Sequence, residues 1–148
     1  MDTLSIRALR SDDRAAWEPL WAGYLKFYGA TIASDVTDTT WSRLMDPAEP
    51  MHAVGCFDGG SLIGIVHYIF HRSTWTVGNY CYLQDLFTAE AARGRGAGRA
   101  LIEAVYERAR DAGASRVHWL TQDGNATARA LYDQVADRPG FIQYRRIL

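Results

Sequence analysis

The chain has 148 residues, long enough to bury a core, and we expect residues 1–148 to form a single domain. Hydrophobic residues make up 48% and charged residues 22%, as in globular proteins, and a net charge of −1 without a long basic run gives no indication of a nucleic-acid partner. Two cysteines, no signal peptide and no apolar stretch of membrane-spanning length predict a cytoplasmic protein with no disulfide framework and no membrane partner.

The first part of the chain predicts a strand and then a strongly aromatic helix. Apolar and polar residues alternate over 4–8, which indicates a strand, and Ser11 is a suitable N-cap for the helix. The apolar positions that follow share one helical face: Trp17, Leu20, Trp21, Tyr24, Phe27 and Tyr28. Core packing accounts for the first three. Tyr24 and Tyr28 lie at the end of the helix, where side chains can line a pocket.

The middle of the chain predicts a short helix, a hairpin and a central strand. The expected elements are a loop at 29–38, a helix at 39–44, strands at 51–57 and 61–70, a connector at 71–79 and a strand at 80–88. The turn Asp58-Gly59-Gly60 between the first two strands is a hairpin signal.

A glycine-rich basic turn, Arg93-Gly94-Arg95-Gly96-Ala97-Gly98-Arg99, leads from the central strand into an amphipathic helix. Glycines at the start of a helix let a ligand approach free backbone N–H groups, and the positive helix end attracts an anion. Three arginines add positive charge, so the turn predicts a phosphate or pyrophosphate site. The turn lacks the Gly-Lys-Ser/Thr ending of a nucleotide P-loop and the GxGxxG spacing of a dinucleotide fold. An ordinary glycine-rich turn with solvated arginines is the alternative.

The last part of the chain predicts a strand at 116–121, a helix capped by Asn125 and a final strand at 141–148, after Pro139-Gly140. The resulting order is β-α-α-β-β-β-α-β-α-β. This order indicates an α/β fold with a mixed sheet flanked by helices.

The order of elements and three motifs resemble the GNAT N-acetyltransferase superfamily. Arg93, Gly96 and Gly98 match the Arg-x-x-Gly-x-Gly of its coenzyme A pyrophosphate loop. The segments TWTVGNYCYLQDLFT and HWLTQDGNATARALYDQV look like the corresponding regions of diamine acetyltransferases and yeast histone/polyamine acetyltransferases, including an Asn and, seven residues later, a Tyr (Asn125 and Tyr132). The resemblance covers residues 64–148 well and the first half by element order. It implies a homodimeric, acetyl-CoA-dependent N-acetyltransferase with a GNAT-like sheet.

The same resemblance assigns roles to the residues around the turn. Residues 93–99 would hold the acetyl-CoA pyrophosphate, and backbone groups of Leu86, Phe87 and Thr88 would pair with the pantetheine arm. The Phe87 N–H is expected to polarise the thioester carbonyl, a donor whose loss typically costs ~3 kcal/mol. The Asn125 amide would also contact the arm. The Tyr132 phenol would protonate the leaving sulfur, with a core tyrosine as the alternative.

Asp85 is the candidate general base, because an alkyl ammonium must lose a proton before attack. A structural, hydrogen-bonded carboxylate is an equally good interpretation, and His52, His67 and His71 are weaker candidates for the base. The residue before Asp85 is Gln84, where diamine acetyltransferases carry Glu. A Gln can orient an amine or a water but cannot accept the proton.

The acceptor pocket is expected between the end of the first helix, the 29–38 loop and the 71–79 connector. The candidate lining residues are Tyr24, Tyr28, His71, Trp75, Gln84 and Asp85. Aromatic faces with one negative charge suit a cationic amine such as a polyamine, a lysine side chain or an amino acid. No metal site is expected. Two other function classes stay open: a non-catalytic acyl-CoA-binding or regulatory module on the same fold, and a nucleotide- or phosphometabolite-binding domain that uses the same turn.

Overall fold

The computed structural model describes residues 4–148, and within that range one five-stranded sheet has the order β1-β2-β3-β4-β5. The first four strands pair antiparallel with their neighbours, and β4 pairs parallel with β5. The elements are β1 (Leu4–Ala8), η1 (Ser11–Asp13), α1 (Arg14–Phe27), α2 (Ser34–Met45), β2 (Met51–Asp58), β3 (Ser61–His71), β4 (Tyr80–Thr88), η2 (Glu90–Ala92), α3 (Ala97–Asp111), β5 (Arg116–His118) and α4 (Ala126–Val135). The mixed α/β sheet predicted from the sequence is confirmed.

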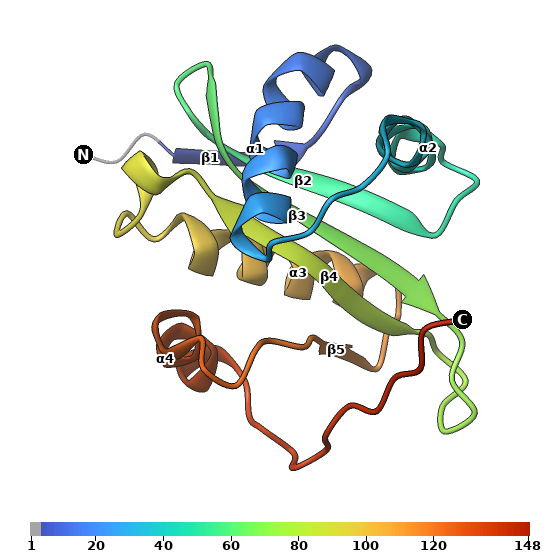
Figure 1. Cartoon of the computed structure of the whole chain (residues 1–148). Coiled ribbons are helices and arrows are strands. Elements are labelled where there is room, and N and C mark those ends of the chain that lie inside the picture. The colour runs from blue at the N-terminus through green and yellow to red at the C-terminus, as the bar shows by residue number, and fades with distance from the viewer. Residues whose placement is uncertain (1–3) are drawn as a thin grey trace.

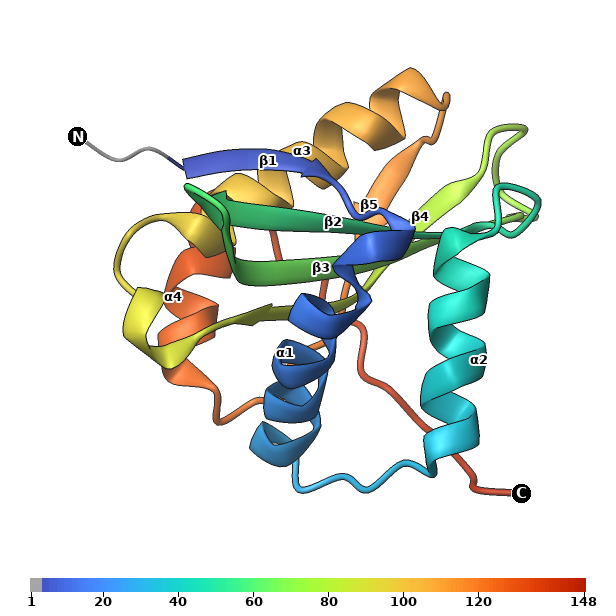
Figure 2. The same cartoon turned by 90° about the horizontal axis from the view of Figure 1, so that it is seen from above.

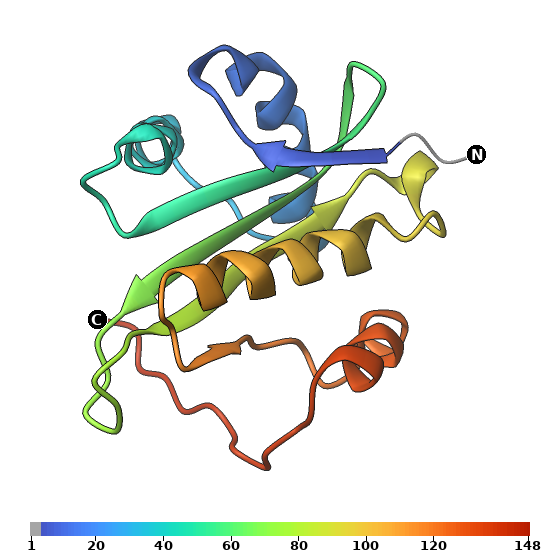
Figure 3. The same cartoon turned by 180° about the vertical axis from the view of Figure 1, so that it is seen from behind.

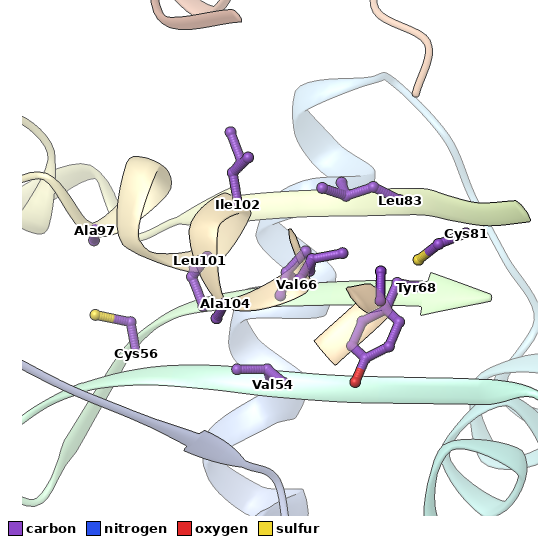
Figure 4. Close-up of a cluster of buried hydrophobic side chains, with 12 residues drawn as sticks. Val54, Cys56, Val66, Tyr68, Cys81, Leu83, Ala97, Leu101, Ile102 and Ala104 are labelled. Carbon is purple, nitrogen blue, oxygen red and sulfur yellow. The ribbon is translucent and has the colours of Figure 1, made fainter. Parts of the chain in front are cut away.

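Helices cover both faces of the sheet. Figure 2 shows α1 and α2 on one side of the strands and α3 on the other. Adjacent strand residues therefore enter different cores: Val66 packs with α3 in the cluster of Figure 4, whereas Ile65 packs with α1 and α2. This alternation is the two-residue period of a strand covered on both faces.

The aromatic helix is confirmed, and its start is different from the one expected. Trp17, Leu20 and Trp21 are buried, as predicted. Ser11 does not cap α1, because residues 11–13 form a turn of 3-10 helix and the N-cap is Asp13. The Asp13 carboxylate instead accepts a 2.7 Å bond from the Arg7 guanidinium, so the acidic start of the helix is held to β1.

The second helix is longer than predicted. It begins at Ser34, so residues 34–38 are helical although they were expected in a loop. Asp, Val and Thr in its first turns have weak helix propensity, so the sequence did not predict that the helix begins there. Burial of Trp41 and Leu44 supports the helix in the fold.

The predicted final strand at 141–148 is absent: within the described chain, these residues form neither helix nor strand. Their apolar side chains are exposed, with Phe141 at 82% and Tyr144 at 88%. A strand needs a paired neighbour, and β5 is only three residues long because the strand expected at 116–121 ends at His118. Figure 3 shows the terminal segment running past β5 without joining the sheet.

The central strand has a different environment along its two edges. Its β3 edge is paired to Thr88, with a bulge between His67 and Tyr68 that leaves Gln84 without a partner in the register. Its other edge pairs with β5 only as far as Tyr82 and His118. Among residues 4–148, no strand lies beside residues 83–88 on that side, and we call this segment the open edge of β4. In Figure 1, β5 lies near the beginning of β4, and α4 lies towards the other end.

Candidate functional site

The glycine-rich turn presents the N-terminus of α3 to solvent. Gly94 and Gly96 have φ angles of 82° and 81°, which favour glycine, and no atom lies within 4 Å of a Cβ built at either position. Gly96 is the N-cap, and the first helical bond runs from the Ala100 N–H to the Gly96 carbonyl. The N–H groups of Ala97, Gly98 and Arg99 precede that bond, so they are available to an anion at the positive end of the helix.

The three arginines of the turn have different contacts. The Arg95 guanidinium lies 2.7 Å from the Asp58 carboxylate at the β2–β3 turn. Arg99 donates to the Gln134 side chain on α4. Arg93 is exposed and lies over the Phe87 ring, with 5.8 Å between its Cζ atom and the ring centroid. Arg95 and Arg99 thus tie the turn to neighbouring elements, while Arg93 lies beside the end of β4.

Helix α4 carries Tyr132, and Asn125 lies at its start. Asn125 occupies the N-cap position, as predicted, but its side chain does not cap the helix and its amide lies 3.4 Å from the Thr121 hydroxyl. The Tyr132 ring packs edge-on against Trp119, 5.4 Å away. Burial, together with nearby Tyr28, raises the pKa of Tyr132 to about 12, so its phenol is protonated at neutral pH.

Asp85 lies in a buried cluster of hydrogen-bonding side chains between β4, β3 and α1. Its Oδ2 atom is 2.9 Å from His67 Nδ1, and its side chain is only 11% exposed. Trp17 donates from Nε1 to His67 Nε2 at 2.9 Å. Burial, and then the charge and hydrogen bonding of Asp85, raise the pKa of the Tyr24 phenol.

Tyr28, at the end of α1, links the two candidate catalytic residues in space. Burial is the larger cause that raises the pKa of Tyr28, and the charge of Asp85 is the second. Tyr28 in turn contributes to the raised pKa of Tyr132. Tyr28 is therefore coupled electrostatically to the carboxylate on β4 and to the phenol on α4. Close packing of α1 on the sheet sets this arrangement: a Cβ at Gly23 would lie 2.8 Å from the Phe87 ring.

Two predicted pocket residues lie apart from this cluster. His71 pairs with Tyr80 at the start of β4, whereas Asp85 pairs with His67, four positions away along the strand or ~13 Å. His71 contacts the His118 ring at 3.2 Å, and Trp75 is 75% exposed. Gln84 is exposed at the bulge, and its side chain acts to lower the pKa of the neighbouring Tyr82, against the larger effects of burial and of the Asp85 charge. Contact of His71 and Trp75 with a substrate stays a prediction.

The contact between Trp17 and His67 could not be predicted from the sequence. Fifty positions separate these residues along the chain, and each has an ordinary core explanation by itself. Tyr82 was also missed as a neighbour of Asp85. Burial is the larger cause that raises the pKa of Tyr82, and the charge of Asp85 is the second. The only sequence signal was its place three residues before Asp85 on the central strand.

The residues of the turn and the open edge fit acetyl-CoA. The turn offers backbone donors without Cβ atoms in the way and an exposed guanidinium for a pyrophosphate. The open edge of β4 offers unpaired backbone positions for the amides of a pantetheine arm. These two features are continuous along the chain from residue 83 to residue 99.

Comparison with known proteins agrees with this geometry. The Acetyltransferase (GNAT) family model matches residues 7–136. The chain belongs to the GNAT acetyltransferase family. As a member of this family, it is an N-acetyltransferase that uses acetyl-CoA and moves the acetyl group to an amine.

Individual relatives cover the chain to different extents. The D-amino-acid N-acetyltransferase HPA3 of Saccharomyces cerevisiae is 36% identical over 98% of this chain and 91% of its own length. The thialysine N-epsilon-acetyltransferase of Caenorhabditis elegans is 36% identical over 57% of this chain and 52% of its own. The solved structure of AAC(6')-Iy with the bisubstrate analog CoA-S-monomethyl-acetylneamine has a TM-score of 0.84 at 15% identity, with 98% of each chain covered, and shares the fold.

Proposed function

We propose that this GNAT enzyme acetylates a primary amine by direct attack in a ternary complex, with the amine held between Asp85 and Tyr132. The observation that carries the proposal is the Asp85 carboxylate on β4, which is 11% exposed and lies 2.9 Å from His67. Tyr28 supports a role for both residues, because Asp85 contributes to its raised pKa and Tyr28 contributes to the raised pKa of Tyr132. A direct transfer needs a proton acceptor and a proton donor on either side of the reacting centre. We assign these two tasks to the Asp85 carboxylate and to the Tyr132 phenol, which its raised pKa keeps protonated at neutral pH.

Each part of the site has a separate task in this proposal. Bound acetyl-CoA supplies an activated acetyl thioester. Asp85 accepts the ammonium proton, directly or through water, and Tyr132 donates its phenolic proton to the leaving sulfur. The Phe87 N–H on the open edge of β4 polarises the acetyl carbonyl. Asn125 contacts the pantetheine arm.

The pyrophosphate is held by the turn at residues 93–99. The N–H groups at the start of α3 supply neutral donors, and Arg93 is proposed to supply the main charge, since the guanidinium groups of Arg95 and Arg99 also bind Asp58 and Gln134. Leu86 and Thr88 contribute backbone groups to the pantetheine arm on either side of Phe87.

The acceptor is proposed to be a small cationic amine, either an amino acid or a lysine-like side chain. The phenols of Tyr24, Tyr28 and Tyr82 surround one carboxylate, and aromatic faces attract an ammonium group. The similar proteins named above are acetyltransferases of D-amino acids and of thialysine, which supports an amino-acid amine more than a long polyamine. Gln84, exposed beside Tyr82, is proposed to orient the amine, and His71 and Trp75 would contact only an extended acceptor.

An acetyl-transfer screen tests the proposal. Coenzyme A release is measured with D- and L-amino acids, lysine analogues, polyamines and basic peptides. Amine-dependent release with a small amino acid or lysine analogue is the expected result. Acetyl-CoA binding without release for any amine would instead support a non-catalytic acyl-CoA-binding module. A thermal shift with ATP or NAD but not acetyl-CoA would support a different phosphate ligand.

Assembly, domain extent and location are also proposals. We propose a homodimer, and exposed Tyr144 and its apolar neighbours at 141–148 offer surface for a partner copy. Light scattering at micromolar concentration is expected to show a dimer, and a monomer would contradict it.

We also propose one acetyltransferase domain over residues 1–148 and a cytoplasmic location, which the free buried thiols of Cys56 and Cys81 fit. Within the part of the chain that the structure describes, no helix has the length and apolar character needed to cross a membrane.

A further inference from the structure

A buried chain of hydrogen bonds runs from α1 through β3 to the candidate base on β4. Trp17 Nε1 is 2.9 Å from His67 Nε2, and His67 Nδ1 is 2.9 Å from Asp85 Oδ2. The Trp17 side chain is fully buried and His67 is 3% exposed. The two ring nitrogens of His67 are therefore each committed to one protein partner.

The indole at one end fixes the tautomer of the imidazole. An indole Nε1 can only donate, so His67 Nε2 must accept and cannot carry a proton. The remaining proton of the neutral ring lies on Nδ1 and is donated to Asp85. This assignment follows from the identity of the partners, because exchanging the tautomer would place two N–H groups against each other at Nε2.

The same arrangement excludes His67 as the base itself. Its single acceptor nitrogen is occupied by Trp17, and burial keeps the ring out of reach of a substrate. Asp85 remains reachable, with 11% of its side chain exposed and the phenol of Tyr24 facing it. A carboxylate has about four acceptor positions, so one bond from His67 leaves others for an amine or a water.

The register of the sheet explains why the carboxylate needs this support. His67 and Asp85 are the last pair before the β3–β4 bulge, beyond which the pairing shifts by one residue. A bulge re-aims the side chains next to it and removes regular neighbours. The bond from His67 to Oδ2 fixes the rotation of the carboxylate at this irregular position.

We infer that His67, held in one tautomer by Trp17, is a positioning residue that orients the Asp85 carboxylate for proton transfer from the amine. The inference rests on the proposed function of Asp85 as general base. His67 acts only through Asp85, so its replacement lowers kcat and leaves acetyl-CoA binding unchanged.

Two substitutions of His67 separate its two hydrogen bonds. In His67→Asn the amide nitrogen can occupy the place of Nδ1, so the donor to Asp85 is kept and the partner of Trp17 is lost. In His67→Gln the amide reaches the place of Nε2, so Trp17 keeps an acceptor and Asp85 loses its donor. His52→Gln, on neighbouring β2 without a carboxylate partner, is the matched control for loss of a histidine from the sheet.

Steady-state kinetics on an accepted amine, calorimetry with acetyl-CoA and melting curves give the readouts. We expect His67→Gln to lower kcat by ~10–10²-fold, the scale of a slightly misplaced catalytic group, with unchanged Kd for acetyl-CoA. His67→Asn is expected to retain most of the wild-type kcat, and His52→Gln to retain all of it. A kcat for His67→Gln equal to wild type, or equal losses for the Asn and Gln variants, would overturn the inference.

Two further variants keep the test decisive. If His67→Gln does not fold, Trp17→Phe preserves an aromatic ring while removing the N–H that fixes the tautomer, and it should lower kcat several-fold. An unchanged kcat there would also overturn the inference. Asp85→Asn separates the two proposals: if that variant keeps full activity, the general-base role itself fails, whereas its inactivity beside a fully active His67→Gln refutes only the positioning role.

Discussion

The two halves of the proposed site are built in different ways. The cofactor half, comprising the turn at 93–99 and the open edge of β4, consists mainly of backbone groups in one continuous segment. The proposed acceptor half consists of side chains from α1, β3, β4 and α4, of which those on α1, β3 and β4 are linked by hydrogen bonds in the fold. The conformation of the first half depends on the φ angles of its glycines and on the start of α3. The side chains of the second half are oriented by burial and by hydrogen bonds.

This difference indicates how each half responds to substitution. Backbone donors survive most side-chain changes, so the cofactor half should be sensitive chiefly where glycine conformation is required. The acceptor half depends on single functional groups with no duplicate nearby. Substitutions there should change turnover strongly while leaving cofactor binding intact, and the predictions below test this division.

The largest effect is expected for Asp85→Asn. The amide can still accept the His67 hydrogen bond but cannot take the ammonium proton, so kcat should fall by ~10²–10⁴-fold, the range for a general base. Initial rates of coenzyme A release measure the loss, and calorimetry should show an unchanged Kd for acetyl-CoA. Asp46→Asn, an exposed carboxylate at the end of α2, is the control. Equal rates for wild type and Asp85→Asn would leave the carboxylate a structural role only.

Removal of the Tyr132 hydroxyl should have the next largest effect. Tyr132→Phe keeps the ring and its contact with Trp119 but removes the proton donor, so kcat should fall by ~10²-fold with little change in acetyl-CoA affinity. Tyr106→Phe is the matched control, because it likewise removes the hydroxyl of a half-buried tyrosine, one that donates to the Val135 carbonyl away from the proposed reaction. Wild-type kcat in a folded Tyr132→Phe protein would refute the general-acid role.

A bulky residue at Gly96 should break the cofactor half without touching the acceptor half. Valine at φ 81° costs ~1–3 kcal/mol of backbone strain and would distort the start of α3, so the Kd for acetyl-CoA should rise by at least ~10-fold. Gly113→Val imposes comparable strain at the other end of the same helix, where φ is 76°. Calorimetry on both variants distinguishes the site from general destabilisation. Similar Kd values for Gly96→Val and wild type would remove the turn from the binding site.

These two halves also differed in how far the sequence predicted them. The turn could be predicted because its glycines, its arginines and the helix that follows are contiguous in the sequence. The order of strands and helices in the C-terminal half of the chain could be predicted from hydrophobic periodicity. The Trp17–His67–Asp85 chain was hidden because no spacing links residues on three separate elements. The expected strand at 141–148 was wrong because a strand-like composition reports local propensity only, whereas pairing depends on an available neighbour, and β5 ends at His118.

Arginine substitutions sharpen the description of the cofactor half and should have a smaller effect. Arg93→Ala removes a charge that can bond a phosphate, worth ~1.5–3 kcal/mol, and should raise the Kd for acetyl-CoA by ~10-fold or more. Arg95→Ala should raise it less, since that guanidinium also binds Asp58. Calorimetry at two salt concentrations measures both. If Arg95→Ala gives the larger loss, Arg93 is not the main charge at the pyrophosphate.

The smallest effect expected is a dependence of stability on alkaline pH that belongs to the acceptor half. Burial raises the pKa of Tyr132 to about 12, above its ordinary value of about 10 in an unfolded chain. The folded state therefore prefers the protonated phenol. This contribution to stability is fully present below about pH 10 and is lost as pH rises through about 12. The backbone N–H groups of the turn do not titrate in this range.

Urea denaturation of wild type and Tyr132→Phe at about pH 8, 10 and 11 isolates this contribution. Burial also raises the pKa values of Tyr68 and Cys81 to about 12, but both groups are present in both proteins. The difference in unfolding free energy should be constant up to about pH 10 and should then shift in favour of the Phe variant. Parallel curves at all three pH values would mean that the Tyr132 phenol is as well solvated in the folded protein as in the unfolded chain. A phenol so exposed to water would be a poorly placed acid for the leaving sulfur, and the division between a side-chain half and a backbone half would then rest on Asp85 alone.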